Sequence, residues 1–337
     1  MSFWQTLKKE KNRPLMVLAP MADVTDPAFR AIIAQHGAPD VTWTEFISAD
    51  GLFLGGYDAL IKDLAYTEAE RPIVAQFFTA RPDMMEKAAT LAVELGFDGI
   101  DINMGCPDRS VEKGGSGAAL IKNPELAQQI ILAAKRGATG TYRGEQKTIP
   151  VSVKTRIGYN KNEIETWLPA ILETDPAVVT IHARTRKEMS DVPARWEHVK
   201  RAVEIRDALQ ADRPVDERTL IFGNGDVRDI VHGDELCRET GADGAMIGRG
   251  IFGNPWLFNR EVRRDDLPVA VRLQAMVEHT KCFEERCAHK NFAVMKKHYK
   301  AYVNGWDGAK ELRMRLMETH SAREVEEIIS EYLEKMA

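Results

Sequence analysis

The sequence predicts an α/β fold: a (β/α)8 TIM barrel followed by a small all-α helical bundle. Eight short apolar runs, rich in β-branched residues, alternate with helical patterns as far as about residue 265. These runs are continuously apolar, which is typical of parallel strands covered on both faces. Beyond Pro268 the strand signals stop and helical periodicity continues. Eight such units over about 250 residues favour a closed barrel, with an open doubly wound sheet as the alternative.

The elements of the barrel follow one another with recognisable boundaries. The expected strands are residues 14–20, 40–46, 72–78, 98–104, 148–156, 177–183, 219–224 and 243–248. The expected helices are residues 27–35, 83–95, 124–136, 162–173, 196–209 and 228–240. Asp83 and Asn123 are of the type that caps helix starts, and Gly37, Gly96 and Gly137 of the type that ends helices.

The C-terminal part is predicted to be entirely helical. Helices are expected at residues 268–289, 292–303, 307–318 and 321–335. The last begins with a Ser321-x-x-Glu324 capping box. Because no low-complexity linker precedes these helices, we expect them to pack on the barrel. The predicted domains are a barrel, residues 1–265, and a helical domain, residues 266–337.

Composition excludes several classes of protein. The chain has 337 residues, 44% of them hydrophobic and 29% charged, with a net charge of −5, as expected of a globular protein without a coat of positive charge. No apolar run is long enough for a transmembrane helix, and the basic N-terminus lacks the apolar core of a secretory signal, so we expect a cytoplasmic protein. The four cysteines are scattered, which favours reduced thiols. None has the usual zinc-ligand spacing, so we expect no metal site.

The candidate site residues follow from the barrel geometry, because active sites of TIM barrels lie at the carboxyl ends of the strands. Polar or ionisable side chains and glycines stand at nearly every such end. They are Met21, Glu45, Gln76, Asn103, Cys106, Lys154, His182, Asn224, Gly225, Asp226, Gly248 and Arg249. Any one of them is more often a satisfied core group, but the set on one face indicates an active site.

Two turns predict a phosphate site. Residues 222–227 and 247–255 are glycine-containing turns after the seventh and eighth strands, where TIM barrels frequently bind phosphate. Simple tight turns are the alternative. Neither turn has the context of a dinucleotide-binding motif, so we expect a phosphorylated ring cofactor. Lys154 would then stabilise the charge of the reduced ring, although a Schiff-base lysine stays open.

Several segments together resemble a known family. They are "APMADVTDPAFR" (19–30), "DINMGCPDRSVEKGGSGAAL" (101–120), "VKTRIGY" (153–159), "IHARTR" (181–186), "FGNGDV" (222–227) and "GAMIGRGIFGNPWLF" (244–258). This set resembles the FMN-dependent tRNA-dihydrouridine synthases of bacterial type. The resemblance covers the whole barrel and, more weakly, residues 295–313. It implies that residues 1–265 are an FMN-binding catalytic domain and that residues 266–337 are an RNA-binding domain. After Arg184 the chain departs from it, because "TRKEMSDVPARW" (185–196) replaces the glycine-rich pattern of the family.

The resemblance implies a cofactor, a substrate and residue roles. It implies an FMN barrel that uses NADPH or NADH to reduce a uracil base in folded RNA to dihydrouridine. The implied FMN contacts are Ala19, Pro20, Met21, Gln76, Lys154, His182, Asn224, Gly225, Asp226, Gly248 and Arg249. Cys106 would be the proton donor, and Asn103 and Arg184 would face the uracil.

Uracil chemistry suits this assignment. Hydride from reduced FMN adds at C6, and a protonated thiol, whose ordinary pKa is about 8.5, gives its proton to C5. The nucleotide must be flipped out of its stack, so RNA contacts are needed. The predicted contacts are Arg109, Lys113, Lys296, Lys297, His298, Lys300 and Arg313. We expect a monomer that binds tRNA, with ribosomal RNA as the alternative, and neither DNA nor membrane. Competing predictions are an FMN enzyme of a free pyrimidine such as dihydroorotate, and a non-catalytic RNA-binding protein.

Overall fold

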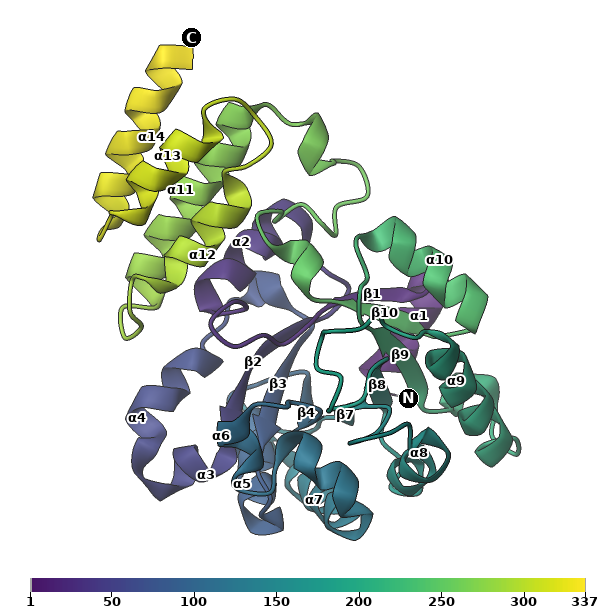
Figure 1. The fold of residues 1–337 in the computed structure, drawn as a ribbon. Coiled ribbons are helices and arrows are strands. Elements are labelled where there is room, and N and C mark those ends of the chain that lie inside the picture. The colour runs from purple at the N-terminus through teal and green to yellow at the C-terminus, as the bar shows by residue number, and fades with distance from the viewer. Residues whose placement is uncertain (1, 337) are drawn as a thin grey trace.

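Eight parallel strands form a closed barrel in the computed structural model, which describes residues 2–336 (Figure 1). The strands are β1 (Leu15–Leu18), β2 (Thr42–Ser48), β3 (Ile73–Phe78), β4 (Gly99–Met104), β7 (Val151–Arg156), β8 (Val178–His182), β9 (Leu220–Asn224) and β10 (Gly244–Ile247). They neighbour one another in the order β1-β10-β9-β8-β7-β4-β3-β2. A parallel bridge between Val17 and Val41 joins β1 to the chain entering β2. The barrel prediction is therefore confirmed, and the open sheet is excluded.

The helices around the barrel lie within a few residues of their predicted positions. They are α2 (Pro27–Gly37), α5 (Pro82–Glu94), α7 (Pro124–Gly137), α8 (Ile164–Leu172), α9 (Glu197–Leu209) and α10 (Ile230–Thr240). Asn123 caps α7, since its side chain accepts from the Leu126 N–H at 3.2 Å. The prediction for Asp83 is wrong, because Pro82 occupies the first helical position of α5 and Arg81 precedes it as N-cap.

Short elements complete the barrel domain. They are α3 (Ala49–Gly51), α4 (Tyr57–Leu60) and α6 (Arg109–Glu112), together with the single turns Leu52–Gly56, Ile61–Leu64, Glu68–Glu70, Gly117–Lys122, Val215–Glu217, Arg249–Ile251 and Arg264–Asp266. An antiparallel hairpin of β5 (Thr139–Tyr142) and β6 (Glu145–Thr148) was not predicted. Arg143 and Gly144 have φ of 50° and 85°, as a two-residue hairpin turn with primed geometry requires.

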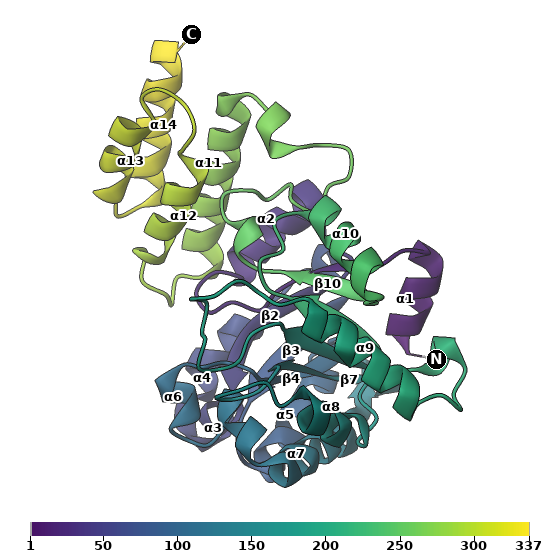
Figure 2. The same cartoon turned by 45° about the vertical axis from the view of Figure 1, so that its right-hand side comes forward.

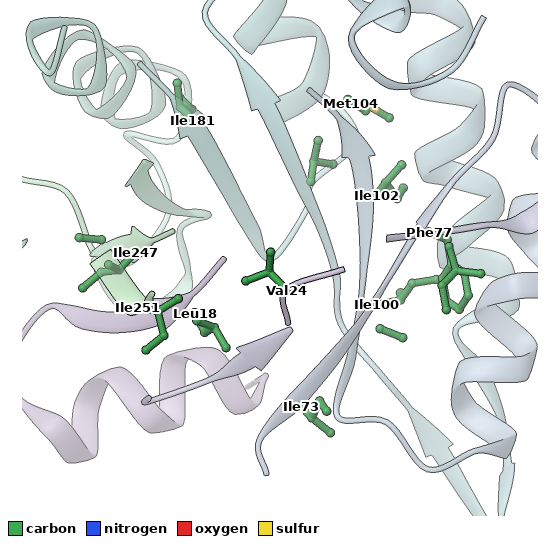
Figure 3. Close-up of a cluster of buried hydrophobic side chains, with 14 of the residues drawn as sticks. Leu18, Val24, Ile73, Phe77, Ile100, Ile102, Met104, Ile181, Ile247 and Ile251 are labelled. Carbon is green, nitrogen blue, oxygen red and sulfur yellow. The ribbon is translucent and has the colours of Figure 1, made fainter. Parts of the chain in front are cut away.

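An N-terminal helix, also not predicted, closes the bottom of the barrel. In α1 (Phe3–Lys11), Trp4 is fully buried and its ring centroid lies 5.5 Å from that of Trp43 and 5.7 Å from that of Phe222. These rings pack among inward-facing apolar residues of the strands. The opposite faces of the strands bury a second apolar layer against the helices, part of which Figure 3 shows. Apolar side chains therefore fill the barrel interior at the amino ends of the strands.

The C-terminal helices pack against one side of the barrel. They are α11 (Val269–Arg286), α12 (Val294–Tyr302), α13 (Ala309–Met317) and α14 (Ala322–Met336), and they lie together beyond α2 in both views (Figures 1 and 2). Half of the predicted capping box forms: Ser321 accepts from the Glu324 N–H, while the Glu324 carboxylate accepts from the His320 N–H. No helix within residues 2–336 is long and apolar enough to cross a membrane.

Candidate active site

A cavity of about 260 Å³ opens at the carboxyl ends of the strands. Its lining residues are Ala19, Pro20, Met21, Lys154, His182, Arg184, Ser190, Asn224, Gly225, Asp226, Val227, Gly248 and Arg249. Of the predicted cofactor residues, only Gln76 is not among them. Larger clefts beside α1, of about 850 and 640 Å³, lie at the amino ends of the strands. Ten of the eleven predicted cofactor residues thus line one cavity at the end where TIM barrels carry their chemistry, whereas Cys106 and Asn103 are not among its lining residues.

The loops after β9 and β10, together with Arg184 from the loop after β8, form a positively charged recess at the cavity. We call its residues Arg184, Gly225, Asp226 and Arg249 the cationic cradle. Gly225 has φ of 117°, and a Cβ there would lie 2.8 Å from that of Ala194. The Asp226 carboxylate accepts from Arg249 at 2.6 Å and from Arg184 at 2.5 Å, so two guanidinium groups face one carboxylate. Burial opposes ionisation of Asp226, but the hydrogen bond from Arg184 and its neighbours hold its pKa below the ordinary value. The cradle keeps a net positive charge, which suits a phosphate.

Lys154, near the end of β7, lines the cavity. Among residues 2–336, no carboxylate oxygen lies within 4.0 Å of its Nζ. Burial lowers its pKa to about 8, and the charge of Arg156 adds to this effect. Lys154 is therefore mostly cationic at neutral pH, as a group that receives developing negative charge should be.

His182, at the end of β8, is neutral. Burial and then the charges of Arg156 and Lys154 lower its pKa well below the ordinary value. Arg184 Nη1 lies 3.1 Å from His182 Nε2. Because a guanidinium only donates, this contact assigns Nε2 as the acceptor and places the ring proton on Nδ1. His182 is thus held in one tautomer, and Arg184 is the residue that holds it.

A buried polar network lies beneath the cavity. Gln76 Nε2 donates to Asp101 at 2.6 Å, and Ser152 Oγ donates to the other Asp101 oxygen at 2.5 Å. Asn103 Nδ2 donates to Gln76 Oε1 at 3.2 Å. Burial raises the pKa of Asp101 to about 6. Asp101 and Ser152 were missed by the sequence analysis, although an acid inside an apolar strand was the available signal. The network fixes the orientation of Gln76.

The Gly-Cys-Pro turn (Gly105–Pro107) is held at every backbone polar atom. Asn103 Oδ1 accepts from the Gly105 N–H at 3.1 Å and from the Cys106 N–H at 2.9 Å. The Cys106 carbonyl accepts from the Ala118 N–H at 3.0 Å. Arg156 and Arg186 donate to the carbonyls of Gly105 and Pro107. Burial raises the pKa of the Cys106 thiol, so it stays protonated at neutral pH.

The predicted substrate contacts, Asn103 and Arg184, already have protein partners. Asn103 is 5% exposed and uses its oxygen for the turn and its nitrogen for Gln76. Arg184 is 2% exposed and donates to the Val192 carbonyl at 2.6 Å as well as to Asp226. Their observed contacts orient other site residues, and Arg184 also lines the cavity.

Most of the predicted RNA contacts lie on the surface. Arg109 and Lys113 are exposed beside the Gly-Cys-Pro turn, and Lys300 is exposed on α12. Lys296, Lys297 and Arg313 are half-buried, and Arg313 donates to the Val303 carbonyl at 3.0 Å. Within residues 2–336, none of these six has a carboxylate within 4.0 Å.

The prediction for His298 is wrong, because this ring lies inside the protein. It is 0% exposed and packs against Phe29 of α2, with ring centroids 4.9 Å apart, and against His279, at 4.6 Å. The helical period explains the difference: Met295, His298 and Tyr302 share the buried face of α12. The lysines of α12 lie on the other face.

An ionic cluster joins the helical part to the barrel mouth. Lys290, between α11 and α12, lies 2.7 Å from Glu45 and 3.3 Å from Asp63. The second Glu45 oxygen accepts from the Asp23 N–H at 2.5 Å, in the loop that follows Met21. Burial raises the pKa of Glu45, and Lys290 opposes that effect. Glu45 is therefore a link between the helices and the cavity loop.

The fold and the site together define a TIM-barrel enzyme whose cationic cradle, at the ends of its last strands, suits a phosphate group. Among solved structures, it is similar in fold to a 2-naphthoyl-CoA reductase, with a TM-score of 0.53, 10% identity, and 73% of this chain and 49% of that chain covered. It is also similar to histamine dehydrogenase from Rhizobium sp. 4-9, with a TM-score of 0.50, 11% identity, and 79% and 48% covered.

Sequence comparison is more specific. The family model described as "Dihydrouridine synthase (Dus)" matches residues 17–337. A probable tRNA-dihydrouridine synthase of Staphylococcus epidermidis is 38% identical over 99% of this chain and 97% of its own length. A probable tRNA-dihydrouridine synthase 2 of Bacillus subtilis is 39% identical with the same coverage. The chain belongs to the dihydrouridine synthase family.

Proposed function

We propose that this protein reduces the C5=C6 bond of specific uridines in tRNA to dihydrouridine, using FMN and NADPH or NADH. The observation that carries the proposal is the position of Cys106, on a hydrogen-bonded turn that follows β4 at the same barrel end as Lys154, His182 and the cationic cradle. The names of its relatives, tRNA-dihydrouridine synthases, support the same substrate.

The chemistry of the donor set fits FMN. The glycine turn at Gly225 and the arginine pair at Asp226 suit a phosphate, and an unpaired Lys154 suits an electron-rich ring edge. The residues proposed to hold the cofactor are the eleven predicted ones. Gln76 would contact it through the side-chain amide that Asp101 and Asn103 orient. When bound and reduced, FMN supplies a hydride, which the uracil receives at C6.

The protein's own contribution to the reaction is a proton. Addition of hydride at C6 places an electron pair on C5 and the C4 carbonyl, and the Cys106 S–H bond breaks to form the C5–H bond. The resulting thiolate regains its proton from solvent after each turnover. Because burial disfavours the thiolate, Cys106 is suited to act as an acid and not as a nucleophile.

RNA binding is proposed for two groups of cations. Arg109 and Lys113 stand next to the Cys106 turn, where the phosphates of a flipped nucleotide would pass. Lys296, Lys297, Lys300 and Arg313 form the group on the helical part. Since none of the six has a carboxylate within 4.0 Å among residues 2–336, we propose that they pair with phosphate. Ribosomal RNA remains the alternative substrate, and the protein would act as a monomer.

The test is reconstitution with a defined RNA. Purified protein, FMN and NADPH are incubated with unmodified tRNA, and dihydrouridine is mapped by mass spectrometry, with dihydroorotate tested as a free pyrimidine substrate. We expect a yellow protein that forms dihydrouridine in tRNA and leaves dihydroorotate unchanged. A protein that takes up no FMN, or that acts only on the free pyrimidine, would contradict the proposal.

A further inference from the structure

We propose that Arg186 and Glu112 are positioning residues that fix the Gly-Cys-Pro turn for proton transfer. This inference rests on the proposed function, because it gives the pair a role in delivering the proton of Cys106. The pair joins two loops: Glu112 ends α6, six residues after Cys106, and Arg186 belongs to the β8 loop (residues 183–196).

The contact between the two side chains is bidentate and largely shielded. Arg186 Nε donates to the two Glu112 oxygens at 3.0 and 2.9 Å, and Nη2 donates to the carboxylate as well. The side chains are only 25% and 10% exposed. The same Nη2 donates to the Pro107 carbonyl at 3.4 Å. A bidentate arginine–carboxylate pair fixes direction as well as distance, so it defines where the turn sits.

Arg156 holds the other side of the turn. Its Nε donates to the Gly105 carbonyl at 2.8 Å, and its Nη1 donates to the carbonyls of Thr185 and Met189 at 3.1 and 3.0 Å. Burial lowers the pKa of Arg156 to about 10, so it remains charged at neutral pH. The residues before and after Cys106 are thus both tied, through arginines, to the β8 loop.

The β8 loop is itself braced. Arg195 donates to both Glu188 oxygens at 2.8 and 2.7 Å, and Glu188 accepts from the Thr185 N–H at 2.7 Å. Met189 has φ of 51°, an uncommon conformation for a residue with a side chain, and its carbonyl is held by Arg156. The next residue, Ser190, lines the cavity. The segment that departs from the family pattern therefore forms a rigid support, and the support contacts the turn that carries Cys106.

A rigid support has a specific consequence for the reaction. Proton transfer needs the donor sulfur aligned with C5, and misplacement by about 1 Å can slow a reaction by about 100-fold. Removing either side chain leaves the other without an oppositely charged partner. The Pro107 side of the turn then loses its restraint. The thiol then becomes mobile and more accessible.

The experiment compares Arg186→Met, Glu112→Gln and the double variant with a matched control. The control pair is Arg201–Glu165, which has the same bidentate geometry at 2.8 and 3.0 Å on the surface of α9 and α8. Three quantities are measured in the flavin-bound proteins: alkylation of Cys106 by iodoacetamide, read by peptide mass spectrometry; flavin reduction by NADPH; and single-turnover oxidation of the reduced enzyme by tRNA. Thermal melts and tRNA affinity accompany them.

We expect alkylation of Cys106 to be about fivefold faster in each variant, because exposure governs thiol reactivity. Oxidation by tRNA should be at least about tenfold slower, whereas flavin reduction and tRNA affinity should be unchanged. The double variant should be no slower than the slower single variant, since one contact is lost in all three. Arg201→Met and Glu165→Gln should behave as the wild type.

Wild-type rates of both alkylation and tRNA oxidation would overturn the inference. A loss of tRNA affinity that accounts for the slower oxidation would assign Arg186 to RNA binding instead. Equal slowing of both half-reactions with a lower melting temperature would assign the pair a merely structural role. If the wild type forms no dihydrouridine, the proposed function fails, and the alkylation rates still decide whether the pair restrains Cys106.

Discussion

Replacing Lys290 by Met should weaken the attachment of the helical part to the barrel and so lower the free energy of unfolding of the protein. The substitution removes the cation 2.7 Å from Glu45, in a pair whose side chains are 11% and 6% exposed. Breaking a buried ion pair by removing one partner costs about 3–5 kcal/mol. Because Lys290 keeps some contact with water, we expect a loss at the lower end of this range, about 3 kcal/mol.

The stability lost in Lys290→Met should depend on pH. Burial raises the pKa of Glu45, and without Lys290 it rises further, so the folded variant binds a proton that the unfolded chain releases. Stability then falls as pH rises, and the deficit against the wild type is largest at alkaline pH and shrinks toward pH 5. Adding Glu45→Gln should recover part of the loss, because no buried charge is then left unpaired.

The assay is urea unfolding of the variants at pH 5 and pH 8. Lys281→Met is the control, because it removes an ion pair with Glu326 at 2.6 Å whose side chains are 49% and 48% exposed. Such a surface pair contributes about 0–1 kcal/mol. A Lys290→Met loss as small as that of the control, or a double variant as unstable as the single one, would refute the reasoning.

Three further predictions concern other parts of the molecule. The affinity for FMN, measured by fluorescence quenching, should fall as Lys154 loses its proton at about pH 8, and Lys154→Met should abolish that pH dependence. Lys296→Gln and Lys300→Gln should each weaken tRNA binding and lower the slope of log affinity against log salt by about 0.7–0.9, without changing flavin content. Arg30→Met should destabilise the protein by about 3–5 kcal/mol in urea melts, because it leaves Glu70 fully buried and unpaired; a loss below about 1 kcal/mol would contradict this.

The barrel and the position of its site could be predicted because both depend on local signals. Continuous apolar runs such as residues 98–104 identify strands buried on two faces, and parallel order then brings their carboxyl ends together. Lys154, His182 and Asn224 were found in this way without any knowledge of side-chain contacts. The cavity that they line is the direct consequence of that topology.

The features that were missed depend on tertiary packing. The hairpin of β5 and β6 is mostly exposed, so it lacks the apolar pattern that marks the other strands. Trp4 is buried only because α1 meets the open end of the barrel. Likewise His298 reads as part of a basic cluster until α2 covers its face of the helix. Long side chains from separate loops, such as Arg156 and Arg186, meet the Cys106 turn only in the folded protein.

The central claim is that this protein reduces uracil in tRNA with Cys106 as the proton donor. The most direct test mixes reduced, flavin-bound wild type and Cys106→Ala with unmodified tRNA in a single turnover, and follows flavin absorbance and dihydrouridine content together. The wild type should be reoxidised with one dihydrouridine formed per flavin, while Cys106→Ala should bind flavin and tRNA but stay reduced. Reoxidation of Cys106→Ala with dihydrouridine formed at the wild-type rate would contradict the claim.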